Sequence, residues 1–176
     1  MKLIFLLIFP LILFPQSDSE KIFWNESRKL TWEDFRAKPL KNASFVATTN
    51  SGISFKYSYS ISNNNVEVEY TVISFFDPNG SWYMPEKVNE HILKHEQGHF
   101  DITELHVRIL RKNLESKKFS KKVKSEVERI YQQVEQQRRA MQTKFDVETN
   151  HSRNEKVELQ WRKFISQQLA NYESWK

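Results

Sequence analysis

The chain has 176 residues, of which 39% are hydrophobic and 14% aromatic, and this excludes a disordered chain of low hydrophobicity. The length favours one domain with its own core. The net charge of +5 is a modest excess that does not by itself indicate nucleic-acid binding. The sequence contains no cysteine, which excludes disulfides, a lipoprotein anchor through cysteine and a thiolate metal site.

The first 19 residues have the pattern of a secretory signal peptide. A short basic start is followed by an almost entirely apolar run at residues 3–14 and then by a polar stretch. The run is too short to cross a bilayer, so a cleaved signal is favoured over an uncleaved anchor, which is the alternative. We expect a signal peptide at residues 1–19, one domain at residues 20–176, a secreted or periplasmic location and no stable membrane insertion after cleavage.

Residues 28–83 have the pattern of β-structure. Apolar and aromatic residues alternate over residues 51–61 and again over residues 66–72, as expected for strands with one buried face. The three asparagines at 63–65 are turn residues, because asparagine tolerates positive φ. The two segments therefore predict an antiparallel hairpin.

Residues 84–176 have the pattern of three long helices. The first is expected to begin near Pro85 and to end near Leu114, because proline is favoured in a first helical turn. The second is expected from about Ser120 to Phe145 and the third from about Asn154, since both carry apolar residues at helical spacing. The sequence thus predicts an α+β fold, an N-terminal antiparallel sheet followed by a helical half.

The first of these helices carries the sequence His-Glu-Gln-Gly-His at residues 95–99. Residues four apart on a helix share one face, so His95 and His99 can bind one zinc ion at about 2.0–2.1 Å each. Glu96 is rotated by about 100° and can reach a water beside the metal, which is the position of a general base. Gly98 is costly inside a helix, and the close approach of another segment or of a substrate would explain it.

A catalytic zinc ion needs a third protein ligand, and helix geometry excludes most nearby candidates. Asp101 and Glu104 fall on the other side of the helix, and His106 lies too far along it. His91 could pair only with His95, and that register would leave Glu96 unused. The third ligand is therefore expected from the polar break at residues 145–152. His151 is the first choice, Asp146 the second, and Glu148 or a water the remainder.

Four segments resemble a bacterial family of uncharacterised secreted proteins that are predicted to be zinc-dependent proteases. They are residues 30–35, 51–55, 95–102 and 146–151. The resemblance implies an exported zincin-like domain with His95 and His99 as ligands, Glu96 as catalytic base and the His151 segment near the site. The sequence departs from the family pattern at Ala37 and Ser152, where glycine is expected.

These observations predict a zinc metallopeptidase that acts on a peptide or protein substrate. A metal-activated water would attack the amide carbonyl, with Glu96 taking the proton. One alternative is a non-catalytic zinc-binding protein of the cell envelope that acts by binding partners. A second is a polyanion-binding helical protein, suggested by the basic residues between 111 and 124, but export argues against a nucleic-acid partner.

Overall fold

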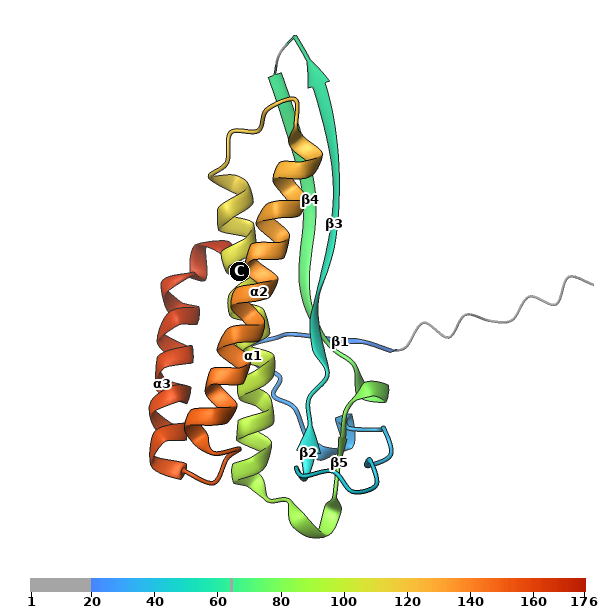
Figure 1. The fold of residues 1–176 in the computed structure, drawn as a ribbon, viewed down its shortest axis with the longest axis vertical. Coiled ribbons are helices and arrows are strands. Elements are labelled where there is room, and N and C mark those ends of the chain that lie inside the picture. The colour runs from blue at the N-terminus through green and yellow to red at the C-terminus, as the bar shows by residue number, and fades with distance from the viewer. Residues whose placement is uncertain (1–19, 64) are drawn as a thin grey trace, which may run out of the picture.

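The computed structural model describes residues 20–63 and 65–176, so the expected signal peptide at residues 1–19 lies outside the described part of the chain. Short strands and one long hairpin come first, and three long helices follow (Figure 1). The fold is therefore α+β, with an N-terminal antiparallel sheet and a helical half, as predicted.

A long antiparallel hairpin forms most of the sheet. Its strands, β3 (Ser51–Ser62) and β4 (Asn65–Phe76), pair along their whole length. Asn63 in the connection has a φ of 48°, the left-handed conformation that asparagine tolerates. β1 (Ile22–Phe23) pairs with the other edge of β4. The predicted hairpin is confirmed.

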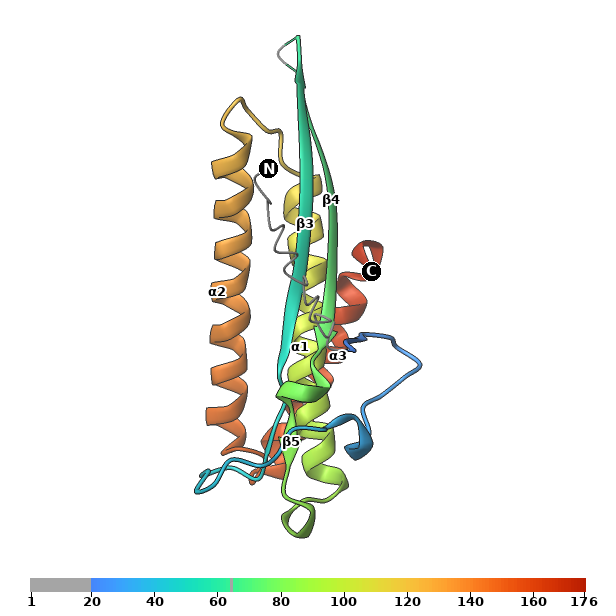
Figure 2. The ribbon, with the colours of Figure 1, turned by 90° about the vertical axis from the view of Figure 1, so that its right-hand side faces the viewer.

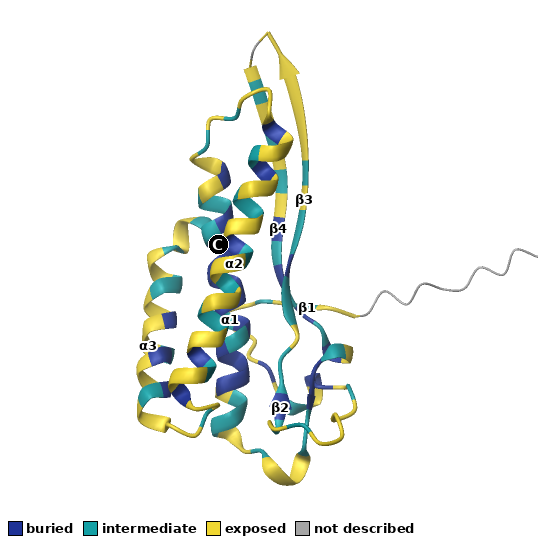
Figure 3. Ribbon diagram, viewed as in Figure 1, coloured by how far each residue is buried: buried dark blue, intermediate teal, exposed yellow. Residues whose placement is uncertain are grey.

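The predicted apolar face of the hairpin packs against the helices over only part of its length. Ile53 is buried, and Phe55 and Tyr57 are packed against the same core. Tyr59 and Ile61 continue the alternation but are 47% and 45% exposed. The hairpin tip extends past the helices, as the exposed colouring there shows (Figure 3).

A second, two-stranded sheet lies near the start of the helical half. β2 (Ala47–Thr48) pairs antiparallel with β5 (Trp82–Tyr83). Pro85 follows, but it begins a 3-10 turn, Pro85–Lys87, rather than the first α-helix as predicted. α1 (Glu90–Glu115) begins after Asn89, whose side-chain oxygen accepts a hydrogen bond from the backbone N–H of Ile92. This side-chain cap fixes the start of the helix.

The second helix ends later than the sequence predicted. α2 (Val123–Thr149) continues one turn past Phe145 and ends at Asn150, which has a φ of 49°. A left-handed asparagine is a common helix terminator, so the stop signal is Asn150 and not the polar residues before it. α3 (Glu155–Asn171) begins after Asn154, which caps it by accepting from the N–H of Val157, close to the predicted boundary.

α1 is the central element of the molecule. It packs against α2, α3 and the β3–β4 ribbon (Figures 1 and 2). Most of its residues between 95 and 110 are buried, and apolar side chains from all three neighbours cover it. Side chains on α1 are thus held in position by packing against α2, α3 and the β3–β4 ribbon. In the described part of the chain, every helix is too short or too polar to cross a bilayer.

Candidate metal centre

The two motif histidines lie side by side on α1, as predicted. His95 is 4% exposed, and the centroids of the His95 and His99 rings are 4.9 Å apart. Their Nε2 atoms approach to 3.2 Å. Both rings therefore direct the same nitrogen toward one point beside the helix.

Asp146, in the last turn of α2, completes the cluster. Its Oδ1 lies 3.1 Å from His95 Nε2 and 2.9 Å from His99 Nε2. Ligands bound tetrahedrally to zinc at about 2.0–2.1 Å are about 3.3 Å from one another, so these three atoms already have nearly the required spacing. In the part of the chain that the structure describes, this is the only group of three or more such side chains that could hold a metal ion.

The cluster contains Asp146 where the sequence favoured His151. Because α2 continues to Thr149, Asp146 is held on a helix face and not in a loop. His151 follows the helix, with a φ of 51°, and its exposed side chain lines the same cleft without joining the cluster. Asp146 was the second choice, and the carboxylate is the ligand that this geometry supports. Glu148 accepts a hydrogen bond from the Trp161 indole at 2.8 Å instead.

The outer nitrogen of each histidine faces an oxygen acceptor. His95 Nδ1 lies 3.3 Å from Oε2 of Glu158, a residue of α3 that is 0% exposed. His99 Nδ1 is hydrogen bonded to Oε1 of Gln142, whose amide nitrogen donates to the His99 carbonyl at 2.9 Å. Partners of this kind fix the ring orientation and tautomer of metal-binding histidines.

Neither Glu158 nor Gln142 was predicted from the sequence as a partner of the histidines. Glu158 occupies the stripe of α3 that also carries Trp161 and Ile165, so it is a charged residue at a core position, and that position was the available signal. Gln142 lies one turn before Asp146 on the same face of α2, and it could be identified only after Asp146 had been.

Gly98 has the structural reason that the sequence called for. A Cβ atom at this position would lie 3.0 Å from two ring atoms of Phe145. That ring stacks on His95, with centroids 4.4 Å apart and planes 20° apart. The close approach of another segment is therefore confirmed, and it lets α2 come near enough for Asp146 to reach the histidines.

Glu96 lies in the same cleft with a free carboxylate oxygen. The residue is 5% exposed, and its Oε2 has no hydrogen-bond partner within the described residues. A buried carboxylate oxygen without a partner is costly, so its retention here calls for a reason. A water or a substrate proton in the cleft would supply the missing partner.

The cleft itself has a volume of about 730 Å³. Its walls are residues 44–49, the face of α1 that carries His95, Glu96 and His99, and the second half of α2 with the turn that follows. The turn contains three successive left-handed residues, Asn150, His151 and Ser152, and Ser152 has a φ of 64°. The resemblance noted from the sequence led us to expect glycine at position 152, and the left-handed backbone of Ser152 is the conformation that favours glycine. Ala37, the other departure, has no such φ.

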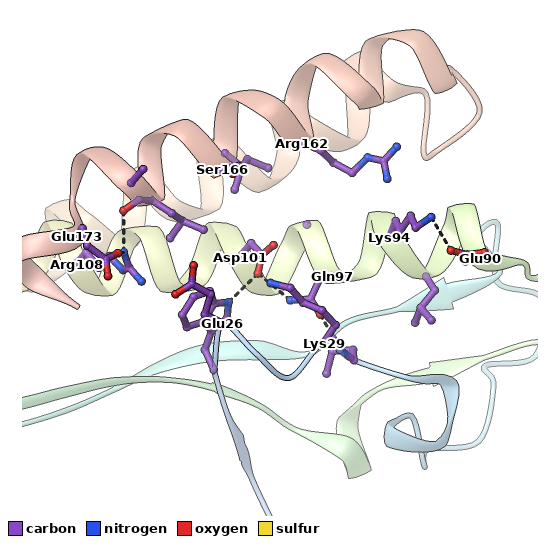
Figure 4. A pocket seen from close by; sticks show the side chains of 17 residues that line it. Glu26, Lys29, Glu90, Lys94, Gln97, Asp101, Arg108, Arg162, Ser166 and Glu173 are labelled. Atoms are coloured by element: carbon purple, nitrogen blue, oxygen red, sulfur yellow. Dashed lines mark hydrogen bonds and ion pairs between the residues drawn. The ribbon is translucent and has the colours of Figure 1, made fainter.

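The candidates that helix geometry excluded do lie elsewhere. Asp101 faces a second pocket on the opposite side of α1, where it accepts hydrogen bonds from Trp24 and Gln97 (Figure 4). Glu104 pairs with Arg108 at 3.0 Å. His106 is bonded to the Ile102 carbonyl.

His91 lies close to the centre without belonging to it. Its Nε2 is 2.8 Å from the Ser152 carbonyl and 3.4 Å from Glu158 Oε2. The ring thus connects the start of α1 to the left-handed turn and to α3. The sequence had ranked His91 low as a ligand, and the cluster of possible metal ligands leaves it out.

The charged groups that surround His95 and Asp146 shift the pKa values of both residues more than burial does. Burial alone would lower the pKa of His95, but the hydrogen bond with Asp146 and the nearby carboxylate of Glu158 outweigh it and raise that pKa to about 9. Burial would likewise raise the pKa of Asp146, but the two histidines hold it well below its usual range. Without a metal, His95 is therefore protonated at neutral pH, and a cation that binds here must displace that proton.

Comparisons with known proteins give a family but no activity. The model of a family described as "Bacterial protein of unknown function (DUF922)" matches residues 27–152. This range contains both histidines, Glu96, Asp146 and His151. No curated protein and no solved structure matches the chain.

Proposed function

The chain belongs to this bacterial family of unknown function, and we propose that it is an exported zinc-dependent hydrolase, a metallopeptidase of zincin-like design. One observation carries the proposal. His95, His99 and Asp146 present three donor atoms at 2.9–3.2 Å from one another, beside a buried Glu96 oxygen that has no partner among the described residues. Two imidazoles and one carboxylate are a donor set that zinc accepts in catalytic sites.

The chain's own residues have separable roles in this proposal. His95, His99 and Asp146 hold the ion, and Gln142 and Glu158 hold the two rings. A bound zinc ion supplies a Lewis acid that acidifies a water and polarises a carbonyl. Glu96 accepts a proton from the attacking water, whose oxygen forms a bond to the carbonyl carbon. When the carbon–nitrogen bond breaks, Glu96 passes that proton to the leaving amine.

The neighbouring strand favours a peptide as the substrate. β2 pairs with β5 along one edge only, and residues 44–49 form one wall of the cleft. An extended peptide can add to a free strand edge through main-chain hydrogen bonds. Such pairing would hold an amide bond of the peptide in the cleft beside Glu96, whatever the side chains of the peptide.

Export is the part of the proposal that depends on the N-terminal sequence. The basic start and short apolar run of residues 1–19 favour a cleaved signal and a periplasmic or secreted product. N-terminal sequencing of the protein recovered from fractionated cells checks this. A mature chain that begins near residue 20 outside the cytoplasm is expected, and a full-length chain in the cytoplasm would contradict it.

The first test is elemental analysis of purified protein. We expect one zinc per chain in the wild type and in Glu96→Gln, and loss of zinc in His95→Ala and Asp146→Ala. His151→Ala distinguishes the two candidate third ligands, because it should keep its zinc if Asp146 is the ligand. A wild type without zinc, or zinc that survives both His95→Ala and Asp146→Ala, would exclude the site.

The second test separates catalysis from binding. A peptide-library digest should show cleavage by the zinc-loaded wild type and at least about a 100-fold loss in Glu96→Gln, the range expected for removing a general base. Zinc binding with no cleavage of any peptide would favour the alternative of a non-catalytic zinc-binding envelope protein.

A further inference from the structure

The charged side chains of the metal cleft are unevenly distributed. The described residues that line it include two carboxylates, Glu96 and Asp146, and both belong to the proposed site. The other ionisable lining residues outside the histidine pair are all basic or neutral. They are Lys87, Arg138, His151 and Arg153.

Two of these cations have no acidic partner. No carboxylate in the described part of the chain lies within ion-pair distance of Lys87 or Arg153, and both side chains are exposed. Most cationic residues elsewhere on α1 and α2 that approach a carboxylate do so within their own helix, as Lys94 does with Glu90. The mouth of the cleft thus keeps its positive charge.

Arg138 adds a third cation at the other end of the cleft. It lies eight residues before Asp146 on α2, about 12 Å along the helix axis. Its Nε and Nη2 donate to Glu135, which also pairs with Arg139, so one carboxylate faces two guanidinium groups. Within the described residues, the hydrogen bonds of Arg138 to Glu135 use Nε and Nη2 and leave Nη1 without a partner, and the residue lines the cleft.

The backbone holds these cations on fixed elements. Lys87 belongs to the 3-10 turn before α1, and Arg153 follows the left-handed residues 150–152. The turn is tied down by the His91–Ser152 hydrogen bond of 2.8 Å and by the N–H of Asn154, which donates to the Thr149 carbonyl at 2.8 Å. Basic residues thus lie on both sides of the metal ligands along the cleft.

From this arrangement we infer that the cleft selects acidic peptides, with aspartate or glutamate side chains on both sides of the bond beside Glu96. The inference rests on the proposed function for the position of that bond, but the charge preference itself does not need the zinc ion. Fixed cations at the two ends of a cleft attract an anionic ligand from a distance, and this attraction becomes weaker as salt is added. They also disfavour a peptide with lysine or arginine at the same positions.

Binding of defined peptides tests the inference without requiring cleavage. The probes are a fluorescent decapeptide with glutamate at four positions and the same peptide with glutamine there, titrated with full-length mature Glu96→Gln protein, both zinc-loaded and in chelator. We expect the glutamate peptide to bind at least about tenfold more tightly at low ionic strength, with the difference shrinking as salt is added.

Charge reversals then locate the preference. Lys87→Glu with Arg153→Glu should abolish it. Lys118→Glu with Lys124→Glu changes the net charge equally at exposed positions on the other side of the molecule, beyond the end of α1, and should leave it unchanged. Equal binding of the two peptides would overturn the inference. So would a preference lost only in the Lys118 and Lys124 variant, which would assign binding to the basic segment at residues 111–124.

The two proposals can fail separately. A protein that holds no zinc but still prefers the glutamate peptide, through Lys87 and Arg153, loses the proposed function and keeps the acidic cleft. A protein that holds zinc and cleaves peptides without regard to charge keeps the function and loses the acidic preference. Circular dichroism of both double variants shows whether they remain folded.

Discussion

Glu158 is a fully buried carboxylate beside the proposed metal ligands. It is 0% exposed, and neither of its carboxylate oxygens has a hydrogen-bond partner of good geometry, although His91, His95 and Arg162 lie between 3.3 and 3.9 Å away. A buried carboxylate that is only loosely paired destabilises a fold unless a cation is close. Because it lies against the outer nitrogen of His95, we expect it to act as a positioning residue in the proposed site.

Glu158→Gln keeps the shape of the side chain and removes its charge. We expect the zinc dissociation constant to rise by about 10- to 100-fold, because an amide is a weaker partner for the His95 ring than a carboxylate. Competition with a chromogenic chelator measures this. Glu148→Gln, on the neighbouring helix and outside the cluster, is the matched control. Unchanged zinc affinity in Glu158→Gln would remove the positioning role.

The residue that joins His95 and His99 in the cluster could not be predicted from the sequence with certainty, and His151 was favoured over Asp146. Helical spacing alone predicted the face shared by His95 and His99, and it placed Asp101, Glu104 and His106 away from that face, where the structure also has them. Whether Asp146 or His151 lies beside the two histidines depends on where α2 ends, and that is set by Asn150 in a left-handed conformation. The polar residues at 146–149 resembled a loop, although they continue the helix for another turn.

Among the helices, the contact between α1 and α2 determines how close the two histidines lie to Asp146. Gly98 lets the Phe145 ring lie against α1, and the same ring packs on His95 and near Trp161. Phe145 is 0% exposed, and it packs against His95, His99 and Trp161, so a shift of its ring would disturb those contacts. The glycine therefore controls the distance between the helix that carries the histidines and the helix that carries Asp146.

Gly98→Ala tests this contact, because two effects oppose each other. Alanine gains about 1 kcal/mol of helix propensity over glycine, whereas overpacking a filled core costs about 1–3 kcal/mol. Because a shift of Phe145 would disturb its contacts with His95 and Trp161, we expect a net loss of up to about 2 kcal/mol in unfolding free energy, together with weaker zinc binding. Urea denaturation and zinc titration measure the two effects.

Phe145→Leu provides the second arm of the cycle. Alone it should destabilise the protein by leaving a small cavity, but combined with Gly98→Ala the two costs should be less than additive, because the added methyl group fills part of that space. Strict additivity would show that the two residues do not restrain each other.

The elements themselves were largely predictable from local patterns. The alternating residues of β3 and β4 and the apolar stripes of the helices gave the order and type of structure. The exposed tip of the hairpin was not predictable, because alternation does not say how far a partner helix extends. Pro85 was also misleading, since the Asn89 cap four residues later begins α1.

At the scale of the whole molecule, His106 should make stability depend on pH. It is 3% exposed on α1, and burial lowers its pKa despite the hydrogen bond to the Ile102 carbonyl. Because the unfolded chain binds a proton at about pH 6.5 and the folded chain only at lower pH, the unfolded state holds more protons between these values. Stability is therefore lost as pH falls below about 6.5, by at most about 1.4 kcal/mol per pH unit.

Comparison with His106→Gln isolates the contribution of His106 to this loss of stability. Urea denaturation in chelator at pH 7.5 and 5.5 should show a larger loss of stability on acidification for the wild type than for the variant. The subtraction also removes His95, whose raised pKa has the opposite sign: its contribution is complete below about pH 6.5 and is lost as pH rises through about 9. Equal losses in the two proteins would show that His106 is not responsible.

The residues of the proposed site come from two parts of the chain that can change independently in evolution. The proposed ligands and base all lie within the family match at residues 27–152, whereas Glu158 belongs to α3, which follows it. A change in α3 could therefore adjust how firmly the metal is held without altering any residue by which a metal site is recognised. Two relatives with the same His-Glu-Gln-Gly-His helix and the same aspartate could then differ in metal retention, and their C-terminal helices would be the place to compare.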